Sequence, residues 1–280
     1  MFAGCASGGG GTETPSAGPD ASATIVVGSQ NEPTNLDQIF GGSSGVTEVF
    51  TGNVYEGLFR ITDDATVEPL LAAETEVSDD GLVYTFKLRD AKFHSGAPLT
   101  AEAVKYSLER FISEDSIAAR KRQLSVIDTV DVVDDSTVKV TLKNKSISFP
   151  YNLGYVWIVN PDAGELTTAA DGTGPYKLAD YRKGDSISLD VNADYWGDAP
   201  SNGGVVYQYY ADPTALNNAL LTGAVDLVTS QSNPDSLAEF EAAGFEIIEG
   251  TSTTKELLAF NDRVAPFDNV EVRKALTSAI

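Results

Sequence analysis

Apolar and polar residues alternate along several short stretches of the chain, and this period of two predicts half-buried strands. Tyr84, Phe86 and Leu88 alternate with polar neighbours. The same alternation recurs at 138–142 after an Asp-Asp-Ser turn, and these residues are expected to pair with a strand near 130–133. Another hairpin is predicted from 176–178 to 187–191 across a Lys-Gly-Asp turn, and the apolar run 24–28 predicts an isolated strand that Gly28 ends.

Helical spacing of apolar residues marks four further stretches. Residues 46–58 carry one stripe, and a second follows Thr100, which suits an N-cap because Glu102 lies in the first turn. Asp212 and Pro213 open a helix that Gly223 ends, and the last helix runs over 233–244. Strands are expected at 225–228 and 245–248. This order predicts an α/β fold with a partly parallel sheet, and the hairpin-rich middle section predicts a separate lobe.

The first 23 residues have a different composition, rich in Gly, Ser, Ala and Thr, which is typical of a flexible tether. The only cysteine, Cys5, follows Ala3-Gly4, and this order resembles the lipobox of bacterial lipoproteins, whose Cys carries lipid. Phe2 departs from that pattern, and neither a basic nor an apolar leader precedes it. The alternative is an ordinary Cys in a disordered tail. If the lipobox interpretation holds, the natural start lies upstream and Cys5 is the lipidation site.

Charge and rare residues exclude several functions. Lys and Arg number 19 against 41 Asp and Glu, which gives a net charge of −22 and argues against nucleic acid and anionic membrane surfaces as partners. One Cys and one His leave no internal disulfide, no zinc ligand set and no mechanism that needs two histidines. No apolar run approaches the ~18 residues of a transmembrane helix. We therefore expect no metal and no cofactor.

Candidate catalytic motifs are weak. Gly41–Gly45 matches the nucleophile elbow G-x-S-x-G, but a loop precedes it and His94 is the only available base, so it is interpreted as a helix entry. His94 itself is interpreted as a structural hydrogen-bonding residue. Residues 172–174, Gly-Thr-Gly, lack the remainder of a dinucleotide or phosphate loop. The chain is not expected to be an enzyme.

Several blocks together resemble one family, the family 5 extracellular solute-binding proteins of ABC importers, the dipeptide-, oligopeptide- and nickel-binding group. The longest block runs from Val77 to Arg110 and includes Lys92-Phe93-His94-Ser95-Gly96. The supporting blocks, in family order, are 36–37, 55–58, 172–176, 192–197, 219–226 and 266–276. We expect most of these motifs to serve the fold and not to touch ligand.

The resemblance implies a periplasmic-binding-protein-like fold of class II with three lobes. After the tether at 1–23, residues 24–44 and 170–260 would form lobe one, with its mixed sheet. Residues 45–169 would form an inserted β-rich lobe two, and 261–280 would begin an incomplete lobe three. Ligand would bind between lobes one and three, which close by hinge motion.

Candidate ligand contacts follow from that arrangement, because strand-end loops at a cleft carry polar groups. After the first strand these are Glu32, Gln38 and Phe40. After the strand at 225 they are Ser230, Gln231 and Asn233, and Asn261 lies at the hinge crossing. Trp157 of the inserted lobe either stacks on ligand or is a core aromatic, and both interpretations stay open.

The resemblance implies a receptor that captures peptides, or another small solute such as a nickel chelate, sugar or opine, for ABC permease subunits. It would act as a monomer on the outer face of the cell membrane, held by lipid on Cys5, or in the periplasmic space. The alternative is a lipid-anchored extracellular interaction or structural protein that keeps the fold without import.

Overall fold

The computed structural model describes residues 22–41, 44–230, 234–250 and 258–279, which fall into two compact units, Met1–Ile247 and Ile248–Ile280. The first unit contains two main sheets with their helices. In the described part of the second unit one helix forms, α7 (Val270–Ala279), and none of its side chains is buried. Over the described ranges, no helix is both long and apolar enough to cross a membrane.

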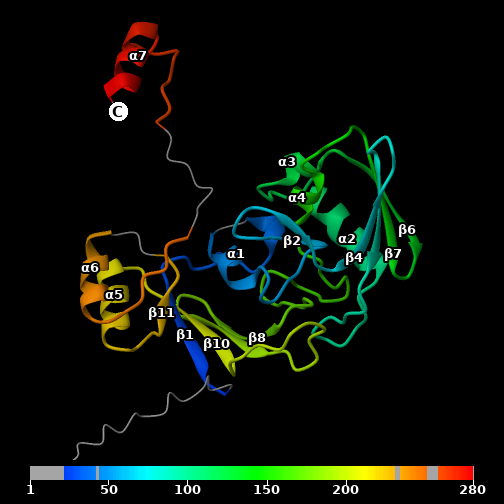
Figure 1. Ribbon diagram of the computed structural model, residues 1–280, viewed down its shortest axis with the longest axis horizontal. Coiled ribbons are helices and arrows are strands. Elements are labelled where there is room, and N and C mark those ends of the chain that lie inside the picture. The colour runs from blue at the N-terminus through cyan, green and yellow to red at the C-terminus, as the bar shows by residue number, and fades with distance from the viewer. Residues whose placement is uncertain (1–21, 42–43, 231–233, 251–257, 280) are drawn as a thin grey trace, which may run out of the picture. The chain divides into compact units, whose positions relative to one another are not determined.

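A five-stranded mixed sheet has the strand order β11-β1-β10-β9-β8 (Figure 1). Its parallel part consists of β11 (Leu227–Val228), β1 (Thr24–Ser29) and β10 (Gly204–Tyr209). Antiparallel strands β9 (Ser186–Val191) and β8 (Tyr176–Arg182) complete it as the predicted hairpin. The expected partly parallel sheet is confirmed, and it combines residues that are almost 200 positions apart in the chain.

Helix α5 (Pro213–Leu221) connects parallel strands β10 and β11, and it begins as predicted. The Asp212 carboxylate accepts a hydrogen bond from the Ala215 backbone N–H over 2.8 Å, and Pro213 occupies the first turn. Buried side chains of α5 share a hydrophobic cluster with Phe240 of α6 (Leu237–Ala242), which follows the 3-10 helix η2 (Pro234–Ser236). The predicted strand at 245–248 is wrong, because residues 245–250 form no strand and Ile248 is 84% exposed.

A second, antiparallel sheet has the order β4-β5-β7-β6, and helix α2 (Ala101–Ile112) packs against it (Figure 1). The strands are β4 (Ala72–Val77), β5 (Val83–Leu88), β6 (Ile127–Asp134) and β7 (Thr137–Leu142). The alternation predicted for β5 buries Tyr84, Phe86 and Leu88, and β6 pairs with β7 as expected. Thr100 caps α2 by accepting a hydrogen bond from Ala103 N over 3.2 Å.

Shorter elements lie outside the two main sheets. These are the 3-10 helix η1 (Gln38–Phe40) and helices α1 (Ser44–Phe50), α3 (Lys121–Leu124) and α4 (Phe149–Leu153). The predicted helix at 46–58 is therefore too long. A positive φ of 76° at Gly52 turns the chain out of α1, although Val54 and Leu58 are still buried.

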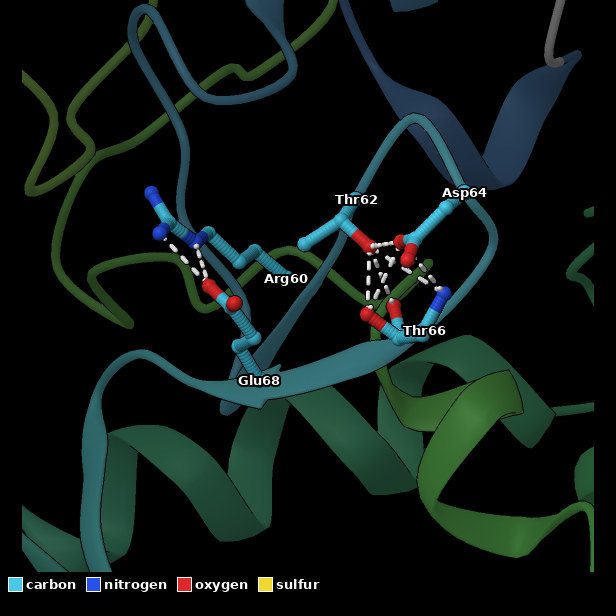
Figure 2. A network of polar contacts seen from close by, with 5 residues as sticks. All are labelled: Arg60, Thr62, Asp64, Thr66 and Glu68. Carbon is cyan, nitrogen blue, oxygen red and sulfur yellow. Dashed lines mark hydrogen bonds and ion pairs between the residues drawn. The ribbon is translucent and has the colours of Figure 1, made fainter. Parts of the chain in front are cut away.

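Strands β2 (Phe59–Ile61) and β3 (Val67–Pro69) form a two-stranded hairpin whose loop residues 63–66 are exposed, and Figure 2 shows its polar contacts. Its loop is held by Asp64, whose carboxylate accepts hydrogen bonds from the hydroxyls of Thr62 and Thr66 over 2.5 and 3.0 Å. Beside the loop, Arg60 and Glu68 form an exposed ion pair of 2.6 Å across the strands. Exposed pairs of this kind contribute little stability, so the hairpin offers a site for control substitutions.

Residues 171–176 are in direct backbone contact with two other segments of the chain, near residues 54 and 94. Gly174 N donates to Val54 O over 3.0 Å, and His94 N donates to Gly172 O over 2.8 Å. A Cβ atom on Gly172 would lie 1.9 Å from Val54 O, and one on Gly174 would lie 2.3 Å from Asn53 O. These glycines are therefore required by close backbone approach, and neither has a positive φ.

Candidate ligand-binding site

The three parallel strands end together at one edge of the five-stranded sheet. Ser29 of β1 is opposite Tyr209 of β10, and Gly28 is opposite Val228 of β11. In open α/β sheets, ligands bind outside the carboxyl ends of the strands, where loops leave the sheet in different directions. The loops that begin at residues 30 and 229 therefore form the candidate site.

Glu48 of α1 connects these two loops. Its Oε2 accepts a hydrogen bond from Asn31 Nδ2 over 3.3 Å, and its Oε1 accepts one from Thr229 Oγ1 over 2.6 Å. Helix α1 lies directly on the first loop, because a Cβ atom on Gly45 would come within 1.9 Å of Asn31 O. One carboxylate thus holds both loops in place, and Gly45 permits the close approach.

Two tyrosines of β10 lie near the same carboxylate. Burial, with the negative charge of Glu48 second, raises the pKa of Tyr207 to about 12 and raises the pKa of Tyr209 further. Both phenols therefore remain neutral at physiological pH. The Tyr209 hydroxyl oxygen is buried and has no hydrogen-bond partner among the described residues. It is a polar group available beside the strand ends.

Four residues of these two loops were predicted to contact ligand, and their surroundings in the structure differ. Glu32 accepts a hydrogen bond from Gly184 N over 2.6 Å, so its carboxylate holds the β8–β9 turn. Ser230 is exposed directly after β11, at the strand-end edge. Gln231 and Asn233 lie outside the described residues.

Gln38 and Trp157 come together away from the strand ends. Gln38 Nε2 donates to Tyr155 O over 2.6 Å, and Trp157 N donates to Gln38 Oε1 over 3.2 Å. The Trp157 side chain is 4% exposed and stacks on Tyr55 with ring centroids 4.8 Å apart. Its indole N–H donates to Thr51 Oγ1 over 3.1 Å. In this chain Trp157 therefore has the surroundings of a core aromatic.

Phe40 is 44% exposed at the end of η1, near a small internal cavity. The cavity has a volume of about 10 Å³ and is lined by Asp37, Gln38, Arg110 and Trp157 among others. Asp37 and Arg110 form an ion pair whose carboxylate is almost fully buried. The cavity is the size of one water molecule, so it does not itself hold a solute.

Asn261 belongs to the unit Ile248–Ile280, where its side-chain oxygen accepts a hydrogen bond from Arg263 N over 3.2 Å. The proposed lipidation site, Cys5, lies outside the described residues. Across the described residues, no group of three or more His, Cys, Asp or Glu side chains is placed to hold a metal ion.

Sequence reasoning missed Asn31, Glu48, Thr229 and Tyr209. Glu48 is a polar residue between Val46 and Val49 of the apolar stripe of α1. From the sequence alone it has the pattern of an ordinary surface residue. Asn31 and Thr229 directly precede the named Glu32 and Ser230, so the loops were identified but the residues within them were not. Only the parallel pairing of β1 with β11 brings Thr229 to Glu48.

Comparisons with known proteins agree on one family. The profile described as "Bacterial extracellular solute-binding proteins, family 5 Middle" matches residues 66–280. The glutathione-binding protein GsiB of Pectobacterium atrosepticum is 29% identical over 267 residues, which cover 92% of this chain and 51% of that protein. A putative ABC transporter peptide-binding protein of Brucella ovis is 31% identical over 222 residues, 75% of this chain and 42% of its own length.

A solved structure shares the fold. DppA of Helicobacter pylori, a periplasmic binding protein in complex with the peptide STSA, is 26% identical with a TM-score of 0.72, over 79% of this chain and 49% of that chain. This chain therefore spans about half the length of the relatives it matches. The likeness confirms the expected periplasmic-binding-protein-like fold. The chain belongs to the bacterial extracellular solute-binding proteins of family 5.

Proposed function

We propose that this chain is part of an extracytoplasmic receptor that captures peptides, or a related small solute, for an ABC transporter permease. The proposal rests on the contact of Glu48 with both strand-end loops. This contact lies at the sheet edge where open α/β folds bind ligands. Relatives named for binding glutathione and the peptide STSA make peptides the first class to test.

The proposed binding mode uses backbone and neutral polar groups. Thr229, Ser230 and the Tyr209 hydroxyl lie at or beside the strand ends and carry no charge. Groups of this kind bind the amides of an extended peptide without selecting a side chain. The net charge of −22 favours cationic peptides over anionic ones at long range. Residues 24–44 and 170–260 are proposed as lobe one, 45–169 as the inserted lobe, and 261–280 as the start of lobe three.

A thermal-unfolding screen of the whole receptor, of which this chain is proposed to be a part, tests the ligand class. A ligand that binds only the folded protein raises its stability by RT ln(1 + [L]/Kd), which is ~2.7 kcal/mol at one hundred times Kd. We expect a pool of short peptides to raise the melting temperature, and sugars and free nickel chelates to leave it unchanged. A rise with a sugar or a chelate and none with peptides would overturn the peptide assignment.

The proposed location outside the membrane depends on Cys5. We propose that this thiol carries the lipid and that residues 1–23 are the tether, because the cysteine follows Ala3-Gly4 and precedes a Gly- and Ser-rich stretch. One acyl chain anchors a protein only marginally, so several chains are expected. Mass spectrometry of the native N-terminal peptide tests this, and a free Cys5 thiol in the native protein would contradict it. The protein is further proposed to act as a monomer without catalytic turnover.

A further inference from the structure

The Arg120 guanidinium is held between two tyrosine rings at the surface of the first unit. Its Cζ lies 3.7 Å from the ring centroid of Tyr155 and 5.5 Å from that of Tyr151. The two tyrosine hydroxyls are 3.0 Å apart, which fixes the rings relative to each other. Stacking on aromatic faces holds a guanidinium without using its N–H donors.

One hydrogen bond further orients the group. Arg120 Nη1 donates to Asn152 Oδ1 over 3.3 Å. Asn152 is 3% exposed, and its Nδ2 donates to Ser148 O over 2.9 Å, so the amide cannot easily turn away. The guanidinium also shares a hydrogen bond with the Tyr155 hydroxyl, and because arginine has five N–H donors, others remain for a ligand.

No acidic partner neutralises this cation. Among the described residues, no carboxylate oxygen lies within 4.0 Å of the Arg120 guanidinium, whereas Arg60, Arg110 and Arg182 each have one. The half-buried Arg120 side chain therefore keeps a positive charge that no carboxylate in direct contact compensates. Its position is preorganised for an anion that the chain does not supply.

Exposed apolar side chains occur in the chain segments next to this cation. Ile117 is 68% exposed three residues before Arg120, and Ile117 N donates to Ile39 O over 2.8 Å, which brings the loop to η1 and the exposed Phe40. Gln38 of η1 is in turn bonded to Tyr155 O, the residue that stacks on Arg120. These segments therefore supply a stacked guanidinium and two exposed apolar side chains. We name these residues the Arg120 subsite: Phe40, Ile117, Arg120, Tyr151 and Tyr155.

We infer that the Arg120 subsite binds an organic carboxylate that carries an apolar group, such as the C-terminal residue of a peptide. The guanidinium fork matches the two carboxylate oxygens, and Ile117 and Phe40 offer contacts to the apolar part. The net charge of −22 repels anions at long range, so a carboxylate needs such a local cation. This inference deepens the proposed function and rests on it for its biological meaning.

A titration of the 280-residue chain followed by NMR of arginine Nε–H groups tests the inference directly. The probe is N-acetyl-L-leucine, and the matched control is N-acetyl-L-leucinamide, which has the same apolar group without the charge. We expect the Arg120 resonance, assigned from its absence in Arg120→Gln, to shift saturably with the acid and to stay fixed with the amide. A resonance that moves with neither compound, or equally with both, overturns the inference.

Variants provide the second arm. A hydrogen bond from a charged donor contributes strongly to the free energy of binding. Arg120→Gln should therefore weaken binding of the acid roughly 10- to 100-fold. Arg122→Gln removes an equal charge from an exposed side chain of α3, the helix that Arg120 directly precedes, and should leave the affinity unchanged. An equal loss of affinity in both variants would show that net charge alone causes the effect, and this result would overturn the inference.

The peptide-pool melt separates this inference from the proposed function. If the pool stabilises wild type and Arg120→Gln equally and the Arg120 resonance is fixed, the subsite is wrong and the receptor function stands. If the Arg120 resonance responds to the acid but no pool stabilises the whole receptor, the subsite stands and the peptide-receptor function is wrong.

Discussion

The Glu56 carboxylate accepts a hydrogen bond from the Thr173 hydroxyl over 2.8 Å, although 117 residues separate the two in the chain. Tyr195 OH and Trp196 Nε1 donate to the same carboxylate over 2.8 and 2.9 Å. Glu56 is 2% exposed. Three segments that the family resemblance picked out, 55–58, 172–176 and 192–197, thus meet at one buried group.

Replacing Glu56 by Ala should destabilise the protein by about 3 kcal/mol or more, because three buried donors then lose their acceptor. Glu56→Gln is the matched control. Its carboxamide oxygen can accept from Thr173 and Trp196, and its NH2 can donate to Tyr195, so most of the stability should return. Urea unfolding measures both variants, and equal midpoints for wild type and Glu56→Ala would contradict the role assigned to this carboxylate.

The sign of the pH dependence at Glu56 follows from its burial, which raises the pKa of this carboxyl above the usual 4.5. The folded state therefore keeps the proton to a higher pH than the unfolded state does. The contribution of this protonation to the free energy of unfolding is complete below pH 4.5. It is lost as the pH rises through the raised pKa of Glu56 in the folded state. Unfolding free energies of wild type should fall over that interval relative to those of Glu56→Gln.

His94 contributes a pH dependence of the opposite sign. Its Nε2 lies 3.0 Å from Gly174 O and its Nδ1 accepts from Gly172 N over 3.4 Å, so a neutral ring protonated on Nε2 satisfies both. Burial lowers the pKa of His94 below 6.5. As the pH falls from above 6.5, the unfolded state takes up the proton first and stability decreases until the folded-state pKa is reached.

Substituting His94→Gln should remove this acid-side decrease and leave peptide binding intact. Unfolding by urea between pH 5 and 8 gives the stability, and calorimetric titration gives the affinity. If His94→Gln abolishes binding while the fold is unchanged, His94 has a ligand role that its hydrogen bonds do not indicate.

Gly172→Ala and Gly174→Ala should each destabilise the first unit severely, because the added Cβ would meet backbone oxygens at 1.9 and 2.3 Å. Backbone cannot rotate away as a flexible side chain can, so we expect a loss of about 3 kcal/mol or more. Gly250→Ala is the control, since nothing lies within 4 Å of its added Cβ and its φ is not positive. Similar melting temperatures for all three variants would show that residues 171–176 are not tightly held.

Local chemistry in the sequence predicted much of the fold. The caps at Thr100 and Asp212 and the two hairpins depend on residues within a few positions of one another, and the structure confirms them. The strand expected at 245–248 depended on a short apolar run alone, which sets neither a partner nor a register. The helix expected at 46–58 overlooked the turn that Gly52 makes.

The candidate site was less accessible to sequence reasoning. Contacts such as Glu48 to Thr229, 181 residues apart, arise only from strand order in the sheet. The loops after β1 and β11 could be named because each follows a strand, but the carboxylate that joins them lies in a helix. Glu32 and Gln38 are polar residues at suitable places, yet both make hydrogen bonds within the protein.

We propose that the strand-end loops joined by Glu48 bind the ligand. The decisive test is a calorimetric titration of Glu48→Ala with a peptide selected from the pool. Glu68→Ala removes the same charge from the exposed ion pair shown in Figure 2 and serves as the control. We expect at least a tenfold loss of affinity for Glu48→Ala, about 1.4 kcal/mol, and none for Glu68→Ala. Equal affinities of wild type, Glu48→Ala and Glu68→Ala would contradict it.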